Sequence, residues 1–189
     1  MTQRRVVITG AGTVNALAPD VQGTFAAMAA GRCGIGPLDF PDVERLTIRI
    51  GAQVQGFPPE SHFDKGKLSL YDRFTQFALV AARQAMAQAG LPQESCDHTR
   101  WGAIIGTAGG GNATVNEAYR AVYAEGKNRV HPFTVPRLMG NAAASHLSME
   151  FGLMGPSFAV ATACASSNHA LGLAFQMIRA GLADGMLAG

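Results

Sequence analysis

Short apolar runs alternate with longer amphipathic stretches along the chain. Runs without charge and of strand length occur at residues 101–106, 157–162 and 185–188, as expected of buried strands. Apolar runs at 4–9 and 48–54 predict two more strands. Helices are predicted at residues 19–30, 69–89, 112–124, 136–150 and 164–180. Because strands separated by helices favour parallel pairing, the pattern predicts an α/β fold with a mainly parallel sheet.

The helix predicted at 69–89 carries the clearest helix signals. Ser69 is a suitable N-cap, and Gly90 and Pro92 would end the helix. One face would carry Phe74, Phe77, Ala81, Ala85 and Ala89. The polar, Pro-containing segment 57–67 before it is predicted to be a loop.

Composition narrows the class of protein. Of 189 residues, 48% are apolar and 15% are charged, and the net charge is +2, so a sizeable core is expected. The basic residues are scattered, which argues against a nucleic-acid partner. The first apolar run is too short for a signal peptide or a membrane span. Three widely spaced cysteines, in no metal-ligand pattern, indicate a reduced, cytoplasmic protein that binds no metal.

Two glycine-rich segments raise the question of a nucleotide site. Gly10-Ala-Gly12 follows a predicted strand, as in a dinucleotide fingerprint, but Asn15 stands where that pattern has Gly or Ala. No acidic residue follows at the required distance, so a tight turn is predicted instead. Residues 109–111 lack the Lys of a phosphate loop. Their glycines indicate backbone that passes close to a helix or a ligand.

Cys164 lies where a strand is predicted to end and a helix to begin. Small residues, Ala163 and Ala165, flank it, as a sharp nucleophile elbow requires. The positive end of a helix dipole favours a thiolate, the nucleophilic form of Cys. A small buried Cys that fills space is the equal alternative on this pattern alone. Cys33 and Cys96 lie in loop-like contexts and are predicted to have no catalytic role.

Several motifs together resemble the N-terminal half of an elongating, type II β-ketoacyl-acyl carrier protein synthase, a member of the thiolase-like superfamily. The resemblance covers essentially all of residues 1–189. The motifs are Arg4-Arg-Val-Val-Ile-Thr-Gly10, Gly31-Arg-Cys-Gly-Ile-Gly36, Gly102-Ala-Ile-Ile-Gly-Thr107, Pro132-Phe-Thr-Val-Pro136, Gly152-Leu-Met-Gly-Pro156 and Ala161-Thr-Ala-Cys-Ala-Ser-Ser167. By this resemblance Cys164 matches the acyl-accepting nucleophile.

The resemblance implies one half of an αβαβα fold, in which a mixed, mainly parallel sheet lies between helix layers. It implies acyl transfer to the Cys, followed by decarboxylative condensation with a malonyl thioester. The substrates would be carried on the phosphopantetheine arm of acyl carrier protein, with no other cofactor. A homodimer or heterodimer is implied, paired through residues 157–162, with no nucleic-acid or membrane partner.

The chain departs from the family in what it lacks. The family decarboxylates with two His residues in segments resembling His-Gly-Thr and Gly-His, which are not present here. Only His169 follows the nucleophile closely, and we interpret it as a packed helix residue. We therefore expect the chain to be part of a longer protein and to be inactive in condensation by itself. The alternatives are a non-catalytic chain-length-factor-like subunit, which Cys164 argues against, and a dinucleotide-binding oxidoreductase.

The resemblance also places an acyl pocket at Gly109, Thr134, Met139 and Ala163. The family often has a branched apolar residue where Gly109 stands and an aromatic residue where Thr134 stands. Smaller side chains predict a deeper pocket that reaches the dimer interface. The alternative is that Met139 refills the space, because Met adapts to irregular gaps.

Overall fold

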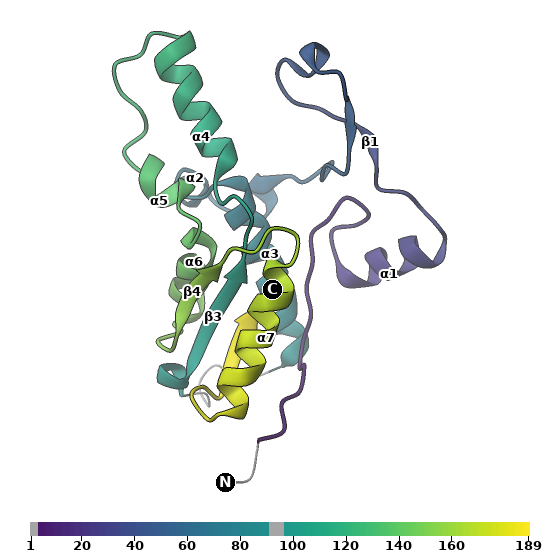
Figure 1. The fold of residues 1–189 in the computed structure, drawn as a ribbon, viewed down its shortest axis with the longest axis vertical. Helices are drawn as coiled ribbons and strands as arrows, with labels where there is room; N and C mark the ends of the chain where they lie inside the picture. The colour runs from purple at the N-terminus through teal and green to yellow at the C-terminus, as the bar shows by residue number, and fades with distance from the viewer. Residues whose placement is uncertain (1–3, 91–96) are drawn as a thin grey trace.

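The structure is a computed structural model, and it describes residues 4–90 and 97–189. Its centre is a three-stranded parallel sheet of order β4-β3-β5, made by β3 (Trp101–Gly106), β4 (Ser157–Val160) and β5 (Gly185–Ala188). Ala103 is in register with Ser157, and Trp101 with Gly185. The sheet confirms the strands predicted from the three uncharged runs, and its strands are parallel as expected (Figure 1).

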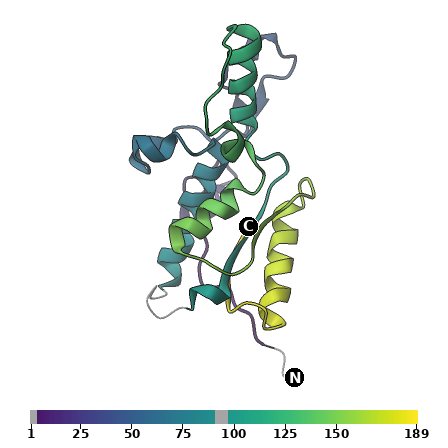
Figure 2. The same ribbon diagram turned by 90° about the vertical axis from the view of Figure 1, so that its left-hand side faces the viewer.

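Helices cover both faces of the sheet. Helix α7 (Ser166–Arg179) lies on one face, and α6 (Ala142–Phe151) lies on the other with α3 (Arg73–Ala89) beside it (Figure 2). Leu79 of α3 and Leu147 of α6 join a core with Ala103, while Ile104 faces the α7 side. Because β3 is buried between the layers, its sequence is apolar without alternation.

The start of α3 differs from the prediction. Helix α2 (Lys65–Leu68) occupies the end of the predicted loop, and Ser69 is its C-cap. The N-cap of α3 is Asp72, whose carboxylate accepts from the Phe74 N–H. Gly90 ends the helix with φ +59°, as predicted, and Pro92 lies outside the described residues.

The helix predicted at 136–150 is divided in two. Helix α5 (Thr134–Leu138) ends before Gly140, and α6 begins at Ala142. The C=O of Leu138 accepts from the Gly111 N–H (3.1 Å), so it is not used to continue the helix. A tertiary contact therefore interrupts a segment whose local pattern is helical.

Gly10 and Gly12 pack against α3 and do not form a turn. A Cβ atom on Gly10 would overlap the backbone of Ala85, and one on Gly12 would overlap that of Ala81. Neither glycine has a positive φ. The predicted tight turn is therefore wrong, because these glycines instead permit close approach to a helix. This packing also argues against a dinucleotide site, since helix backbone occupies the space beside both glycines.

Residues 4–9 are extended but form no strand. Among the described residues, their backbone groups pair with no other strand. A strand needs a hydrogen-bonded neighbour as well as an apolar pattern, and this segment has only the pattern. The predicted first strand is therefore not observed.

Asp184 anchors the beginning of this segment to the sheet. Its carboxylate accepts from Arg100 at 2.6 and 3.1 Å and also from Arg4. The hydrogen bond from Arg100, and then that from Arg4, lowers the pKa of Asp184 to about 2. One carboxylate thus joins the N-terminal segment, the residue before β3 and the loop before β5.

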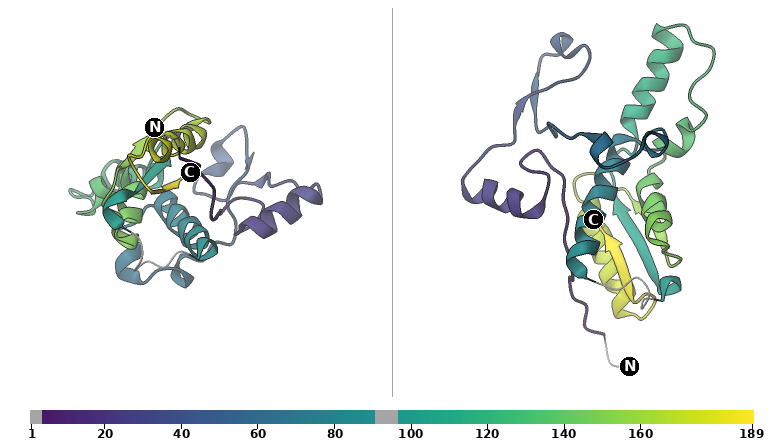
Figure 3. Two further views of the ribbon diagram at one scale, coloured as in Figure 1. Left: turned by 90° about the horizontal axis from the view of Figure 1, so that it is seen from below. Right: turned by 180° about the vertical axis from the view of Figure 1, so that it is seen from behind.

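The remaining elements lie around the sheet. Helix α1 (Val21–Ala29) and the small antiparallel sheet of β1 (Gly36–Pro37) and β2 (Ile50–Gly51) extend away from it, and the right-hand view of Figure 3 shows the same arrangement from behind. The described residues contain no helix long and apolar enough to cross a membrane. The strand predicted at 48–54 is reduced to two residues. The peripheral elements are α1 (Val21–Ala29), β1 (Gly36–Pro37), η1 (Val43–Arg45), β2 (Ile50–Gly51), η2 (Pro59–Ser61), η4 (His98–Arg100), α4 (Asn112–Tyr119) and the π-helix η5 (Arg120–Ala124).

Candidate active site

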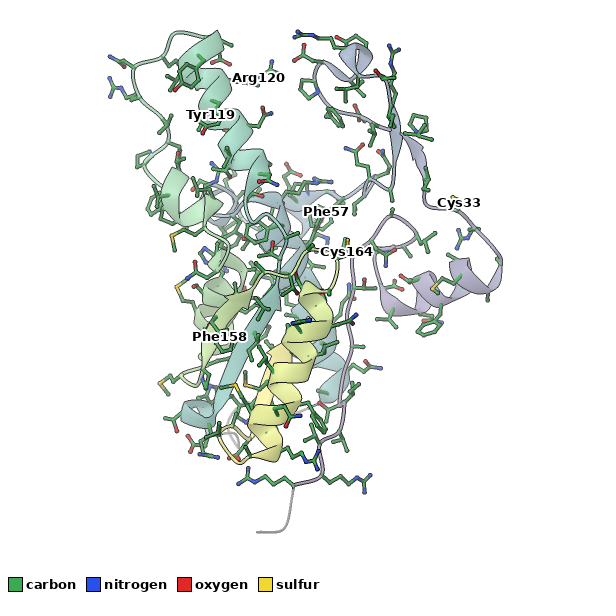
Figure 4. The ribbon with its side chains drawn as sticks, in the orientation of Figure 1. Cys33, Phe57, Tyr119, Arg120, Phe158 and Cys164 are labelled. Carbon is green, nitrogen blue, oxygen red and sulfur yellow. The ribbon has the colours of Figure 1, made fainter. Side chains whose placement is uncertain are left out.

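Cys164 lies in the short turn between the end of β4 and the start of α7. Ala163 before it has φ +50°, one of two positive values among the described non-glycine residues. The small side chain of Ala keeps the steric cost of this left-handed conformation low relative to a β-branched residue. The thiol of Cys164 is free and exposed, at the upper end of α7 in Figure 4. The predicted sharp turn is present, and it presents the thiol to solvent.

Ser166 closes this turn by hydrogen bonds to the two residues that precede Cys164. Its buried hydroxyl accepts from the Thr162 N–H (2.9 Å) and donates to the Ala163 C=O (2.7 Å). The N–H of Ser166 also donates to the Ala163 C=O (3.2 Å). The two residues before Cys164 are therefore held by the side chain of Ser166, which follows it. We did not predict this role, although a Ser in the first turn of a helix is a recognised signal of local hydrogen bonding.

Gly106, the last residue of β3, allows α7 to begin beside the sheet. A Cβ atom on Gly106 would lie 2.5 Å from both the Ser166 O and the Ser167 N. Real side chains do not tolerate such contacts, and backbone cannot move aside as a flexible side chain can. Glycine at the end of β3 therefore sets the position of the first turn of α7, and with it the position of Cys164.

The loop after β3 lies at the same edge of the sheet as Cys164. Thr107 N–H donates to the Val160 C=O (2.9 Å), so the β3–β4 pairing continues to the start of both loops. The Thr107 hydroxyl then accepts from the Gly110 N–H (2.9 Å). Cβ atoms on Gly110 and Gly111 would approach the backbone of Leu138 within 3 Å. The expected close approach of backbone is thus made to the end of α5.

Asp72 fixes the start of α4, which follows this loop. Its buried carboxylate accepts from the N–H (2.7 Å) and the hydroxyl (2.6 Å) of Thr114. The same carboxylate caps α3 through Phe74. One buried acidic group therefore joins two helices beneath the glycine loop, which satisfies the requirement that a buried charge be hydrogen bonded.

The predicted pocket residues occupy different parts of this edge. Gly109 lies in the loop, and a Cβ atom there would meet the Asn112 Nδ2 at 2.5 Å. Thr134 begins α5, where its hydroxyl donates to the His131 C=O (2.6 Å). Met139 follows α5 and is 39% exposed. The three heavy atoms nearest to such a Cβ atom all belong to the Asn112 side chain.

No charged group assists Cys164 in the described structure. Within these residues no hydrogen bond or ion pair joins its thiol to an acidic, basic or imidazole side chain. His169 is exposed on α7, where its N–H donates to the Ala165 C=O (3.0 Å). Cys33 lies on the extended segment far from α7 in Figure 4, and Cys96 is outside the described residues. No three potential ligands gather to hold a metal ion in 4–90 or 97–189.

Comparisons with known proteins agree on one family. A sequence model of the β-ketoacyl synthase N-terminal domain matches residues 3–189. The chain is 44% identical over 186 residues to nodulation protein E of Rhizobium sp. (strain N33), covering 98% of this chain and 46% of that protein. It is 36% identical over 186 residues to the 3-oxoacyl-[acyl-carrier-protein] synthase 2 of Staphylococcus aureus (strain COL), and the match covers 98% of this chain and 45% of that protein.

Solved structures show the same fold. A β-ketoacyl synthase from Burkholderia phymatum STM815 superposes with a TM-score of 0.81 at 28% identity, covering 96% of this chain and 45% of that one. The ishigamide ketosynthase/chain length factor gives a TM-score of 0.88 at 26% identity, and the match covers 96% of this chain and 46% of that one. The chain spans about half the length of the relatives it matches. The family match covers nearly every residue, and the chain belongs to the β-ketoacyl synthase family as its N-terminal domain.

Proposed function

We propose that this chain is the nucleophile-bearing half of a β-ketoacyl-acyl carrier protein synthase and that Cys164 accepts the acyl group. The observation that carries the proposal is the exposed thiol at a turn held by Ser166, directly before a 14-residue helix.

The first half-reaction follows from this placement. The Cys164 thiolate attacks the carbonyl carbon of an acyl thioester, and a tetrahedral oxyanion forms. Its collapse breaks the bond to the carrier sulfur, so the carrier thiol leaves and a Cys164 thioester remains. The backbone N–H of Cys164 itself is the donor we propose for the oxyanion, because the N–H groups of Ala165 and Ser166 already donate to the C=O groups of Thr162 and Ala163. A phosphopantetheine thiol of acyl carrier protein is the carrier we propose, with no other cofactor.

The second half-reaction needs groups that this sequence does not supply. A malonyl thioester loses CO₂, and the resulting carbanion attacks the Cys164 thioester to give a β-ketoacyl product and the free thiolate. We assign the decarboxylating groups to the remaining half of the longer polypeptide. The 189-residue chain by itself would accept an acyl group but would not condense it.

A dimer is the proposed assembly. Strand β4 is an edge of the sheet among the described residues, with β3 on its one paired side. Phe158 and Val160 of this short strand are apolar and half-buried, and an edge of this kind favours pairing with another chain. One similar solved structure is named as a ketosynthase/chain length factor, so a heterodimer as well as a homodimer is consistent with the proposal.

The acyl pocket is proposed to include Gly109, Thr134, Met139 and Ala163. Ala163 adjoins the nucleophile, and Gly109 lies in the loop at the same sheet edge. The Asn112 side chain lies beside Gly109. The pocket is therefore deeper at Gly109 only when the Asn112 side chain rotates out of this space. An amide can rotate about two bonds, whereas a branched apolar residue at Gly109 would close the space permanently.

A non-catalytic subunit is the second candidate, and one comparison separates the two. The full-length polypeptide is assayed for β-ketoacyl product with an acyl-carrier primer and a malonyl-carrier thioester. We expect Cys164→Ala to abolish condensation and Cys33→Ala to leave it unchanged. Equal rates for Cys164→Ala and the parent would refute the assignment of the nucleophile. Absence of product from every form, together with no acylation, would support the non-catalytic subunit.

A further inference from the structure

The side chain of Asn112 places an amide beside the proposed acyl pocket. Asn112 is the first residue of α4 and is exposed. It follows the glycine loop, which lies at the same edge of the sheet as Cys164. A Cβ atom on Gly109 would lie 2.5 Å from the Asn112 Nδ2, 3.3 Å from its Cγ and 3.5 Å from its Oδ1. The whole amide group therefore stands next to Gly109.

Local structure does not account for an Asn at this position. An Asn near the start of a helix usually bonds a nearby backbone group, but the N-cap of α4 is Gly111 and no side chain caps this helix. Among the described residues, the Asn112 amide forms no hydrogen bond. Its donor and acceptor atoms are therefore available to a group that enters the pocket.

The backbone that carries this amide is held on both sides. Before it, the N–H of Gly111 donates to the Leu138 C=O (3.1 Å). After it, the N–H and the hydroxyl of Thr114 donate to the buried carboxylate of Asp72 at 2.7 and 2.6 Å. The amide can turn about the bonds of its own side chain, but its point of attachment is fixed. A group that selects among substrates needs such support.

We propose that Asn112 selects acyl chains that carry an oxygen substituent, and that its amide hydrogen bonds this oxygen when the chain fills the pocket. The inference rests on the proposed function, in which Cys164 holds the acyl group and Gly109 lines the pocket. A hydroxyl group on the chain fits best, because it donates and accepts, and an amide presents both a donor and an acceptor. A plain hydrocarbon chain would displace water from the amide and leave it unpaired, which is unfavourable.

Glycine at position 109 makes this contact possible. A side chain there would compete with the Asn112 amide for the same space, and a branched apolar side chain would cover it. The two residues together give this part of the pocket a hydrogen-bonding surface. A site built to hydrogen bond a substrate group discriminates strongly against the analogue that lacks it, whereas an apolar pocket discriminates weakly against an added hydroxyl.

A hydrogen bond to the rest of the longer polypeptide is the other role open to this amide. That role would fix α4, so Asn112→Leu would lower the stability of the full-length protein and slow acylation equally for all primers. Selection of the chain predicts a different pattern. Asn112→Leu should keep or raise the rate with a saturated primer, because an apolar contact replaces an unpaired amide, and should lower the rate with a hydroxylated primer.

Acylation of Cys164 in the full-length protein measures this selection. The primers are acyl-carrier thioesters of one chain length, either saturated or with a single hydroxyl group at successive carbons, and the acylated protein is quantified by mass spectrometry. We expect kcat/KM for at least one hydroxylated primer to exceed that of the saturated primer by about tenfold. Asn112→Leu should abolish this preference. Asn116→Leu, the same change on an exposed residue one turn along α4, should retain it.

The outcomes separate this inference from the function on which it rests. If no primer acylates Cys164, the proposed function fails and the selection fails with it. If Cys164 is acylated but the saturated and hydroxylated primers react alike, the selection alone is overturned. A preference that survives in Asn112→Leu would also overturn it, as would an equal loss of rate with every primer in that variant.

Discussion

Gly106 at the end of β3 and Ser166 at the start of α7 are packed so closely that no side chain can stand between them. This contact links the buried sheet to the turn that carries Cys164. The position of the thiol is therefore determined by backbone packing from a neighbouring strand as well as by its own turn.

Replacing Gly106 by Ala tests that contact. The added methyl group would meet Ser166 backbone at 2.5 Å, and we expect a loss of about 1–3 kcal/mol in the free energy of unfolding. Acylation of Cys164 should slow as α7 is displaced. Gly36→Ala is the control, because a Cβ atom there meets nothing within 4 Å. Denaturant unfolding with equal midpoints for the two variants would contradict the account.

Removing the Ser166 hydroxyl tests the turn itself. Ser166→Ala leaves the Thr162 N–H and the Ala163 C=O without their side-chain partner, which should cost about 1–3 kcal/mol in the free energy of unfolding. The rate of Cys164 acylation should fall as well, because the turn is less ordered. The exposed Ser167 provides the control variant Ser167→Ala, which should change stability little. A Ser166→Ala protein with parental stability and acylation rate would show that the hydrogen bonds of the Ser166 hydroxyl do not order the turn.

The proposed pocket predicts a dependence on acyl chain length. Gly109→Ile should displace Asn112 and shorten the pocket, so kcat/KM should fall much more for long primers than for short ones. Each excluded CH₂ group is worth up to about 0.8 kcal/mol of binding. Asn112→Ala is the matched comparison, since it opens the same space and should favour long primers. Equal losses across chain lengths in Gly109→Ile would remove Gly109 from the pocket.

Asp184 predicts a dependence of stability on pH. Its pKa is lowered from 3.8 to about 2 in the folded state, first by the hydrogen bond from Arg100. The folded state therefore binds fewer protons than the unfolded state, so this contribution is present above pH 4 and is lost as the pH falls toward 2. Asp184→Asn should show a smaller loss of stability than the parent between pH 5 and pH 2. Parallel curves for the two proteins in denaturant unfolding would contradict this role.

Much of the fold follows from local pattern, and the differences have physical causes. The uncharged run at 101–106 coincides with β3 at both ends. A strand that is buried on both faces is apolar throughout, so the change to polar residues marks where it begins and ends. Local pattern favours Ser69 as the N-cap of α3, whereas the structure uses Asp72. The buried carboxylate of Asp72 also bonds Thr114 of α4, a contact that a local pattern does not contain. The strand predicted at 4–9 needs a neighbour that the described residues do not provide.

The candidate site was predicted less completely than the fold. Cys164 and the sharp turn follow from the order strand, small residue, Cys, small residue, helix. The roles of Gly106 and Ser166 depend on β3 and α7 meeting at residues 60 positions apart in sequence, so sequence spacing alone gives no signal for the pair. Asn112 beside Gly109 was likewise not expected, because the loop conformation places it there.

Covalent labelling measures the central claim most directly. The full-length protein is incubated with an acyl-carrier thioester without the malonyl substrate, and its peptides are mapped by mass spectrometry. The account predicts one acyl group per chain, on Cys164, with labelling lost in Cys164→Ala and retained in Cys33→Ala. Acylation of Cys33 or Cys96, or continued labelling of Cys164→Ala, would contradict it.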